Sequence, residues 1–308
     1  MLLKEEQKYN RIVYHIEKEE DGLTLKTVLQ KRWGISGRLM TRFKKEKGVE
    51  INGHWAPFHQ KVKEKDRLIL NMEENGCEFE AENLPVEVIY EDFDVLVVNK
   101  QPGMLTHPTM KIREGTLANA VMQYMSDNQE RYKIRFVNRL DMDTSGAMIL
   151  AKNAFAHQQL AEQLQSSMIK EYLVFVVGQF KEPYRKIEAA IYRPENIPDG
   201  KPPRRVVDKR GKMAVSHLKR QEVYSKASLL SVKIDTGRTH QIRVHMNYLG
   251  HPVIGDTFYE PEQTNRIERQ ALHAEAVTFI QPRTKEEITC RADMPEDLRC
   301  LRERLLQE

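Results

Sequence analysis

Apolar residues recur at helical spacing in two short segments near the start of the chain. Residues 25–33 carry leucine and valine on one face, and Gly34 is a residue type that commonly ends a helix. Ser36 can cap a second helix over residues 37–47, with leucine, methionine and phenylalanine turned inward. The pattern therefore predicts two consecutive short helices.

Strand periodicity follows these helices. Residues 49–51 and 54–56 predict a β-hairpin, because the Asn-Gly pair at 52–53 supplies the positive φ angles of a type I′ turn. Residues 67–72 predict a further strand. We expect these elements to form a small helix-helix-sheet domain over residues 1–75.

The remainder of the chain predicts many strands with irregularly placed helices. Residues 76–85 are polar, acidic and without periodicity, which predicts a linker into a second domain over residues 86–308. Because strands mostly neighbour strands, we expect an α+β domain around a mixed, largely antiparallel sheet. The predicted strands are 86–90, 95–99, 134–137, 147–151, 170–177, 229–234, 277–280 and 287–290, and the predicted helices are 117–125, 154–165 and one capped by Thr239.

Composition limits the class of protein. A chain of 308 residues with 40% hydrophobic and 31% charged residues is typical of a globular protein with a sizeable core. The apolar runs are too short to span a bilayer, and the first residues lack the apolar core of a signal peptide. Three widely spaced cysteines indicate neither a disulfide framework nor a zinc site. We expect a cytoplasmic protein without a membrane partner.

Positive charge is concentrated on the two predicted helices. Residues 24–47 contain eight lysines and arginines against one glutamate, although the net charge of the whole chain is only +4. A charge run of this kind can be a solvated helix face, but the imbalance favours a phosphate-binding surface. The candidate RNA-binding cations are Lys26, Arg32, Arg38, Arg42, Lys44 and Lys45.

Three segments of the second domain carry candidate chemistry. Residues 135–146 place Arg139 and Asp141 two apart after a short strand, so both project to one side if the chain is extended there. By itself this pair could be a structural ion pair. Residues 170–172 and 236–245 add Tyr172 and Arg243 to the candidate site.

Taken in order, these three segments resemble the RluA-type RNA pseudouridine synthases. The similarity extends from about residue 86 to residue 280 and includes the Lys-x-Pro-Gly loop within residues 99–108 and the segment 271–274. The N-terminal helices and sheet resemble the alpha-L RNA-binding module of a small-subunit ribosomal protein. The resemblance implies a pseudouridine synthase fold, an RNA substrate, and a reaction that needs no cofactor or metal.

The resemblance also implies roles for individual residues. Asp141 corresponds to the catalytic aspartate, which stabilises charge on the ribose, attacks the anomeric carbon or removes the 2′ proton; the choice stays open. Arg243 corresponds to the arginine that pairs with this carboxylate, and Tyr172 to the tyrosine whose ring lies against the target base. Arg139 is expected to enter the RNA helix, Arg238 to contact phosphate and Leu272 to belong to the active-site wall.

One position departs from the resembling family, in which many members carry histidine where Asn138 stands. Asparagine can keep a turn hydrogen bond but does not titrate near neutral pH, so we expect no acid–base role there.

We expect a monomeric enzyme that isomerises uridine in structured RNA. Large-subunit ribosomal RNA is favoured as substrate, with transfer RNA as the alternative. Two other classes remain open, a ribosome-associated RNA-binding protein without turnover and a nucleoside hydrolase or glycosidase. The hydrolase would release free base, whereas the isomerase would not.

Overall fold

The computed structural model describes residues 6–74, 79–195, 204–259 and 266–308. Part of the predicted linker, residues 76–78, lies outside these ranges. Residues 79–85 contain no helix or strand, and the backbone of Glu80 and Glu82 bonds to Asn119. No helix in the described ranges combines the length and the apolar character needed to cross a membrane.

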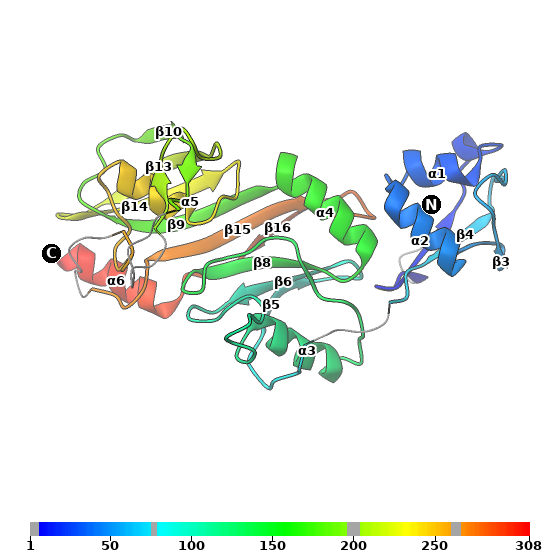
Figure 1. Cartoon of the computed structure of the whole chain (residues 1–308), viewed down its shortest axis with the longest axis horizontal. Helices are drawn as coiled ribbons and strands as arrows, with labels where there is room; N and C mark the ends of the chain where they lie inside the picture. The colour runs from blue at the N-terminus through cyan, green and yellow to red at the C-terminus, as the bar shows by residue number, and fades with distance from the viewer. Residues whose placement is uncertain (1–5, 75–78, 196–203, 260–265) are drawn as a thin grey trace.

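The N-terminal part contains two short helices packed on a small sheet (Figure 1). Its antiparallel strands lie in the order β1-β4-β2-β3. Leu25, Val28 and Leu29 are buried, as their helical spacing predicts. The elements are β1 (Arg11–His15), α1 (Leu25–Lys31), α2 (Gly37–Glu46), β2 (Val49–Ile51), β3 (His54–Trp55) and β4 (Arg67–Asn71).

Local signals in this part behave as predicted. The Ser36 side chain accepts a hydrogen bond from the Leu39 N–H, which caps α2. Gly34 has a φ of 59° just after α1, and Asn52 and Gly53 have φ of 53° and 83° in the hairpin turn. The predicted helix stop, cap and turn are therefore confirmed.

The second part is built on a ten-stranded sheet. Its main order is β10-β13-β14-β9-β15-β8-β6-β5, with β16 beside β15 and β7 beside β8. Every pairing in it is antiparallel except that of β8 with β15. The strands are β5 (Glu87–Glu91), β6 (Val95–Lys100), β7 (Arg135–Phe136), β8 (Ser145–Ala151), β9 (Ile169–Val177), β10 (Tyr184–Glu188), β13 (Val215–Val223), β14 (Ala227–Ile234), β15 (Leu272–Ile280) and β16 (Glu287–Arg291).

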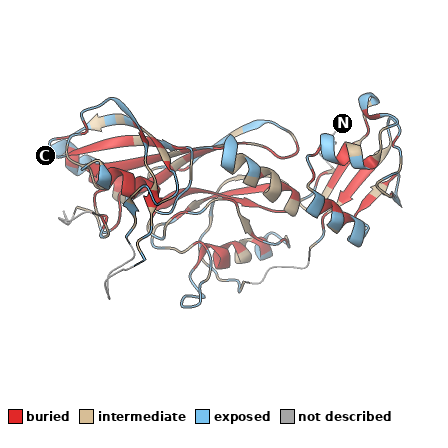
Figure 2. Cartoon of the chain, turned by 45° about the horizontal axis from the view of Figure 1, so that its top comes forward, coloured by how far each residue is buried: buried red, intermediate tan, exposed pale blue. Residues whose placement is uncertain are grey.

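Helices cover both faces of this sheet (Figure 1). Along β6, Val95 and Val97 belong to the cluster under α4 (Ala154–Ser166), whereas Leu96 and Val98 face α3 (Leu117–Asp127). Figure 2 shows that burial is concentrated in the strands. The remaining described elements are the helices α5 (Gln241–Tyr248) and α6 (Glu296–Gln307), the strand pair β11 (Ile191–Tyr192) and β12 (Val206–Val207), and a short 3₁₀ helix (Lys18–Glu20) in the N-terminal part.

Several elements escaped the sequence analysis, namely β1, β10 to β13 and α6. Strand β13 reads Val-Ser-His-Leu-Lys-Arg-Gln-Glu-Val, with too few apolar residues for a clear alternating pattern. It is held in place by antiparallel pairing with both β10 and β14. Tertiary pairing outweighs local propensity there.

The two parts pack against each other. Phe155 of α4 is fully buried in the N-terminal core, with its ring 5.9 Å from that of Trp33. Arg283 bonds to buried Asp94 at 2.8 Å and also donates to the carbonyls of Lys8 and Arg11. The contact surface therefore contains both an aromatic anchor and a buried ion pair.

Candidate active site

Asp141 lies in the loop between β7 and β8, and this loop is anchored at both ends. Asn138 Oδ1 accepts a hydrogen bond from the Ile149 N–H of β8 at 2.9 Å, which is a bond between the loop and the strand and not a local turn bond. Gly146 has a φ of 116°, and a Cβ there would lie 2.2 Å from the Ala274 carbonyl oxygen. Only glycine therefore allows β8 to approach β15 closely behind the loop.

Lys100 holds the same loop in place through hydrogen bonds. Its Nζ donates to the carbonyls of Gln101, Met104 and Met142 at 2.7–2.9 Å, and its side chain is fully buried. Burial lowers the pKa of the Lys100 amine to about 7, although the charge of Asp143 opposes the shift. Three acceptors are satisfied only by the ammonium form, which has three N–H groups. The predicted Lys-x-Pro-Gly loop thus supports the Asp141 loop directly.

Arg243 lies on α5, which begins differently from the prediction. The residue before the helix is His240, with a φ of 57°, and no side chain caps this end. Thr239 is exposed and outside the helix, so its predicted capping role is wrong. The Gln241 side chain instead accepts from Thr236 Oγ1 and the Arg238 N–H, and so it holds the loop before α5.

The Arg243 guanidinium bridges two carboxylates. Its NH1 donates to Asp141 Oδ2 at 2.9 Å, and its Nε and NH2 donate to Asp256 at 2.6 and 2.8 Å. The Asp256 side chain is fully buried, whereas that of Asp141 is 22% exposed. Burial by itself lowers the pKa of Arg243, but its bonds to Asp256 and Asp141 outweigh this and raise the pKa. Arg243 is thus a permanent cation with its orientation fixed from behind by Asp256.

Asp256 was missed by the sequence analysis. It follows Gly255, where a Cβ would lie 2.2 Å from the Arg269 carbonyl oxygen, so the glycine lets this turn pass close to Arg269. Asp256 Oδ1 also accepts from the Phe258 N–H at 3.0 Å. No motif or periodicity around Asp256 signals its pairing with Arg243.

His240 adds a further group beside Asp141. Its Nε2 lies 3.8 Å from Asp141 Oδ2, and its Nδ1 is 3.0 Å from the Tyr259 hydroxyl. The same hydroxyl accepts from the Arg205 N–H, so its own proton is available for Nδ1. Burial lowers the pKa of His240, which favours a neutral ring whose Nε2–H is directed toward the carboxylate.

Tyr172 lies on β9 in the interior of the large sheet and lines the pocket. Its residue is 7% exposed, and no hydrogen bond to its hydroxyl occurs within the described ranges. Burial, and then the negative charge of Asp141, raises the pKa of the Tyr172 phenol. The hydroxyl therefore stays protonated at neutral pH and faces a pocket.

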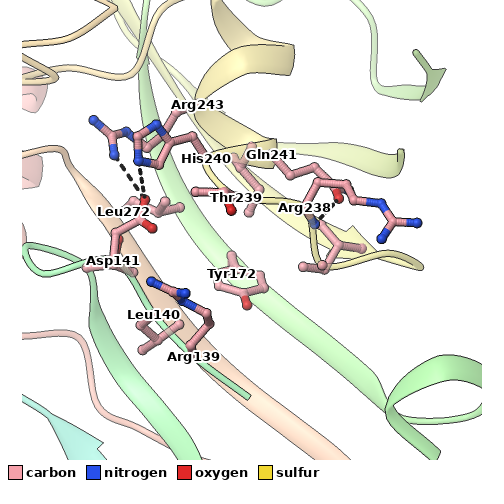
Figure 3. Close-up of a pocket in the computed structure, with 14 residues that line it drawn as sticks. Arg139, Leu140, Asp141, Tyr172, Arg238, Thr239, His240, Gln241, Arg243 and Leu272 are labelled. Carbon is pink, nitrogen blue, oxygen red and sulfur yellow. Dashed lines mark hydrogen bonds and ion pairs between the residues drawn. The ribbon is translucent and has the colours of Figure 1, made fainter. Parts of the chain in front are cut away.

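One pocket brings the three central candidates together. Figure 3 shows Asp141 and Arg243 facing one another, with Tyr172 beside them and the Arg238 guanidinium pointing away from Asp141. Arg139 is exposed and lines the pocket from the Asp141 loop. The lining also includes Leu272, Ile234, Thr239, His240 and Gln241. No group of three metal-ligand side chains occurs among the described residues.

The predicted RNA-binding cations of the N-terminal part differ in their availability. Lys26, Arg38, Lys44 and Lys45 are exposed. Arg32 is also exposed but pairs with Glu17 at 3.3 Å. The Arg42 side chain forms ion pairs with Glu46 and Glu74 and donates to the Glu73 carbonyl. Glu74 also pairs with Arg135 of β7, so Arg42 takes part in the contact between the two parts.

Comparison with known proteins identifies the family. Residues 94–248 match the family model described as RNA pseudouridylate synthase. The chain belongs to this family of RNA pseudouridine synthases. Residues 12–68 match the family model described as the RluD ribosomal pseudouridine synthase N-terminal domain.

Individual pseudouridine synthases are similar over most of their length. An uncharacterised RNA pseudouridine synthase of Bacillus subtilis is 37% identical over 270 residues, covering 86% of this chain and 93% of that protein. Ribosomal large subunit pseudouridine synthase D of Vibrio parahaemolyticus is 33% identical, covering 90% and 86%. The solved structure of human RNA pseudouridylate synthase domain containing 1 has a TM-score of 0.57 at 27% identity, covering 72% and 90%. The predicted fold class is thereby confirmed.

We expect Asp256→Asn to destabilise this pseudouridine synthase. The substitution removes a fully buried carboxylate that pairs with Arg243, and breaking a buried ion pair should cost about 3 kcal/mol of unfolding free energy. Turnover should fall as well, because Arg243 loses its second anchor. Urea denaturation and a turnover assay would measure both.

Glu182→Gln is the matched control for Asp256→Asn. It breaks the exposed pair of Glu182 with Arg185 and should cost less than about 1 kcal/mol. Equal stability of wild type and Asp256→Asn would contradict the anchoring role of Asp256.

Proposed function

We propose that this enzyme converts specific uridines of large-subunit ribosomal RNA to pseudouridine, with Asp141 as the catalytic group. The observation that supports this most directly is the chain of contacts from Asp141 to Arg243 to Asp256 at a pocket containing Tyr172. RNA binding alone requires no such buried arrangement. The names of several relatives favour ribosomal RNA over transfer RNA and over a role without turnover.

The proposed reaction begins at the ribose. The bond from C1′ to N1 of uracil breaks, the base rotates, and C5 joins C1′ in its place. Positive charge develops on the ribose, and Asp141 lies on a solvent-accessible loop where its carboxylate can meet that charge. Arg243 donates to this carboxylate and fixes its rotamer.

Tyr172 is proposed to hold the rotating base. Its ring lies in the pocket wall, and stacking on an aromatic ring is a common way to bind a flipped base. Because its phenol is protonated at neutral pH, any proton that it takes from C5 must be matched by release of its own proton to an acceptor. Arg139, at the mouth of the same pocket, is proposed to enter the space that the uridine leaves.

A direct test uses RNA from a strain that lacks this gene. Purified enzyme should restore pseudouridine at defined positions of large-subunit ribosomal RNA without releasing free uracil. Modification of transfer RNA alone would replace the proposed substrate. Released uracil would indicate a hydrolase, and no product with any RNA would contradict the activity.

We further propose a division of labour between residues 1–75, which bind RNA, and residues 86–308, which carry the chemistry. The site residues Lys26, Arg32, Arg38, Lys44 and Lys45 are proposed to contact phosphate, and Arg238 to do so beside the pocket. Arg42 is proposed to act mainly in the ion-pair network with Glu74. We also propose that the enzyme acts as a cytoplasmic monomer, which sedimentation and cell fractionation would test.

Neutralising Lys44 and Lys45 together should weaken RNA binding and its dependence on salt. Each lost phosphate contact should reduce the slope of log K against log salt by about 0.7–0.9, so the Lys44→Gln, Lys45→Gln variant should lose about 1.5. The maximal rate at saturating RNA should change little, because the chemistry lies in the other part. Filter binding over a salt series would measure the slope.

Lys181→Gln with Lys226→Gln is the charge-matched control. Both residues are exposed near the end of β9 and β14 that is far from Tyr172. The control should keep the wild-type slope. An unchanged slope in the Lys44, Lys45 variant would mean that this run is only a solvated helix face.

A further inference from the structure

A second cavity adjoins the active-site pocket and shares Tyr172 with it. It has a volume of about 430 Å³, within the usual range of about 300–1,000 Å³ for small-molecule sites. Arg139, Tyr172, Ile234, Gly237 and Arg238 line both this cavity and the active-site pocket. The two spaces are therefore adjacent parts of one groove.

Lys170 lies in the wall of this second cavity. Residues two apart on a strand share a face, so Lys170 and Tyr172 of β9 are on the same side of the sheet. The Lys170 residue is only 4% exposed. Burial lowers the pKa of its amine, and the negative charge of Asp235 acts in the opposite direction. The two side chains do not form an ion pair within 4.0 Å.

The Lys170 amine differs from the other buried lysine amines. Lys100 donates to three carbonyls, and Lys152 pairs with Glu91 and Glu130. In the described part of the chain, by contrast, no hydrogen bond or ion pair is made by Lys170 Nζ. The Nζ atom is not among the enclosed side-chain atoms that lack a partner, so the amine of this largely buried side chain opens on the cavity. It is therefore available to donate to a ligand that enters there.

The walls of the cavity indicate what kind of acceptor this is. Phe136, Val137, Leu164 and Ile234 make much of the lining apolar. A charged phosphate would lose most of its hydration against such walls, at a high cost in free energy. A planar base with a ring carbonyl is uncharged, so its burial there costs much less. The cations that suit phosphate, Arg139 and Arg238, are exposed at the junction with the active-site pocket.

We propose that this cavity binds the base of a nucleotide adjacent to the target uridine, and that Lys170 donates a hydrogen bond to a carbonyl oxygen of that base. The proposal rests on the proposed function and names a determinant of sequence preference within it. Uracil, cytosine and guanine offer such a carbonyl, and adenine does not. Lys170 is thus a specificity residue, not a participant in the bond rearrangement.

The test uses short hairpin RNAs that contain a uridine modified by the wild-type enzyme. Each neighbour of the target is replaced in turn by guanine, adenine or an abasic nucleotide, and kcat/KM is measured. For the wild type, one neighbouring position should favour guanine over adenine by about 10- to 100-fold, the range for a hydrogen bond to a charged group. In Lys170→Met this ratio should fall to near one.

Lys233→Met is the matched control. Lys233 lies on β14 opposite Glu171, with which it pairs at 2.8 Å, so it projects from the other face of the sheet. It should keep the wild-type base preference. Lys170→Met should also unfold at the same or a higher temperature than the wild type, because methionine fills a similar volume without a buried amine.

Several outcomes would overturn the proposal. A wild-type enzyme without preference at any neighbouring position would do so, as would an equal loss of rate for all bases in Lys170→Met. A lower unfolding temperature of Lys170→Met would indicate a structural role for the amine. If a neutral methylphosphonate beside the target lowers the wild-type rate but not that of Lys170→Met, the acceptor is a phosphate. Failure of the wild type on every RNA would instead contradict the proposed function itself.

Discussion

Asp141→Asn should abolish pseudouridine formation while leaving folding and RNA binding intact. Asparagine has nearly the same size and can still accept the hydrogen bond from Arg243, but it carries no negative charge. Stabilisation of the developing ribose cation, attack on C1′ and removal of the 2′ proton all require the carboxylate. We therefore expect kcat to fall by at least about a thousandfold, as is usual when a central catalytic group is lost.

The measurement is single-turnover pseudouridine formation at saturating RNA, with affinity determined separately. Asp127→Asn is the control, because it makes the same substitution at an exposed position at the end of α3, outside the residues that line the pocket. It should retain activity within a few-fold of wild type. If Asp141→Asn kept even a tenth of the wild-type rate, Asp141 would not be central to the reaction.

Arg243→Met should be nearly as damaging to turnover and should also destabilise the protein. Asp141 would lose the cation that orients it, and Asp256 would be left as a fully buried carboxylate without a counter-charge. Leaving one charge of a buried pair uncompensated typically costs about 3–5 kcal/mol. Loss of activity in this variant alone would therefore not separate catalysis from folding.

A double variant separates the two effects. Arg243→Met combined with Asp256→Asn leaves no buried charge at this position, and asparagine can still accept from the Phe258 N–H. We expect the double variant to recover much of the lost unfolding free energy but none of the turnover. Recovery of both would mean that Arg243 serves only to balance the charge of Asp256.

Arg243→Lys tests whether the shape of the guanidinium group matters in addition to its charge. Lysine keeps the charge, but its single nitrogen lacks the planar fork whose three nitrogens serve Asp141 and both oxygens of Asp256. It should fold and bind RNA, with kcat reduced by about a hundredfold or more because the carboxylate is no longer fixed. Wild-type activity in Arg243→Lys would show that charge alone is sufficient.

The sequence alone determined those features that depend on a few neighbouring residues. The helix stop at Gly34, the cap at Ser36 and the Asn52-Gly53 turn follow from local backbone and hydrogen-bond preferences, and each occurs as predicted. Motif order along the chain also singled out Asp141, Tyr172 and Arg243 as candidates, and the structure brings all three to one pocket. Thr239 shows the limit of such local signals, since a plausible cap residue lies outside the helix that it was expected to begin.

The tertiary structure decided which distant groups meet and which of them are buried. Asp141 and Arg243 are 102 positions apart, and their contact depends on α5 packing beside the loop that precedes β8. Asp256 behind Arg243, the three carbonyls around Lys100 and the unshared amine of Lys170 leave no pattern in the sequence. Periodicity reports only which face of an element is apolar, whereas the partners of a buried charge are supplied by other elements, and they are known only when the chain has folded.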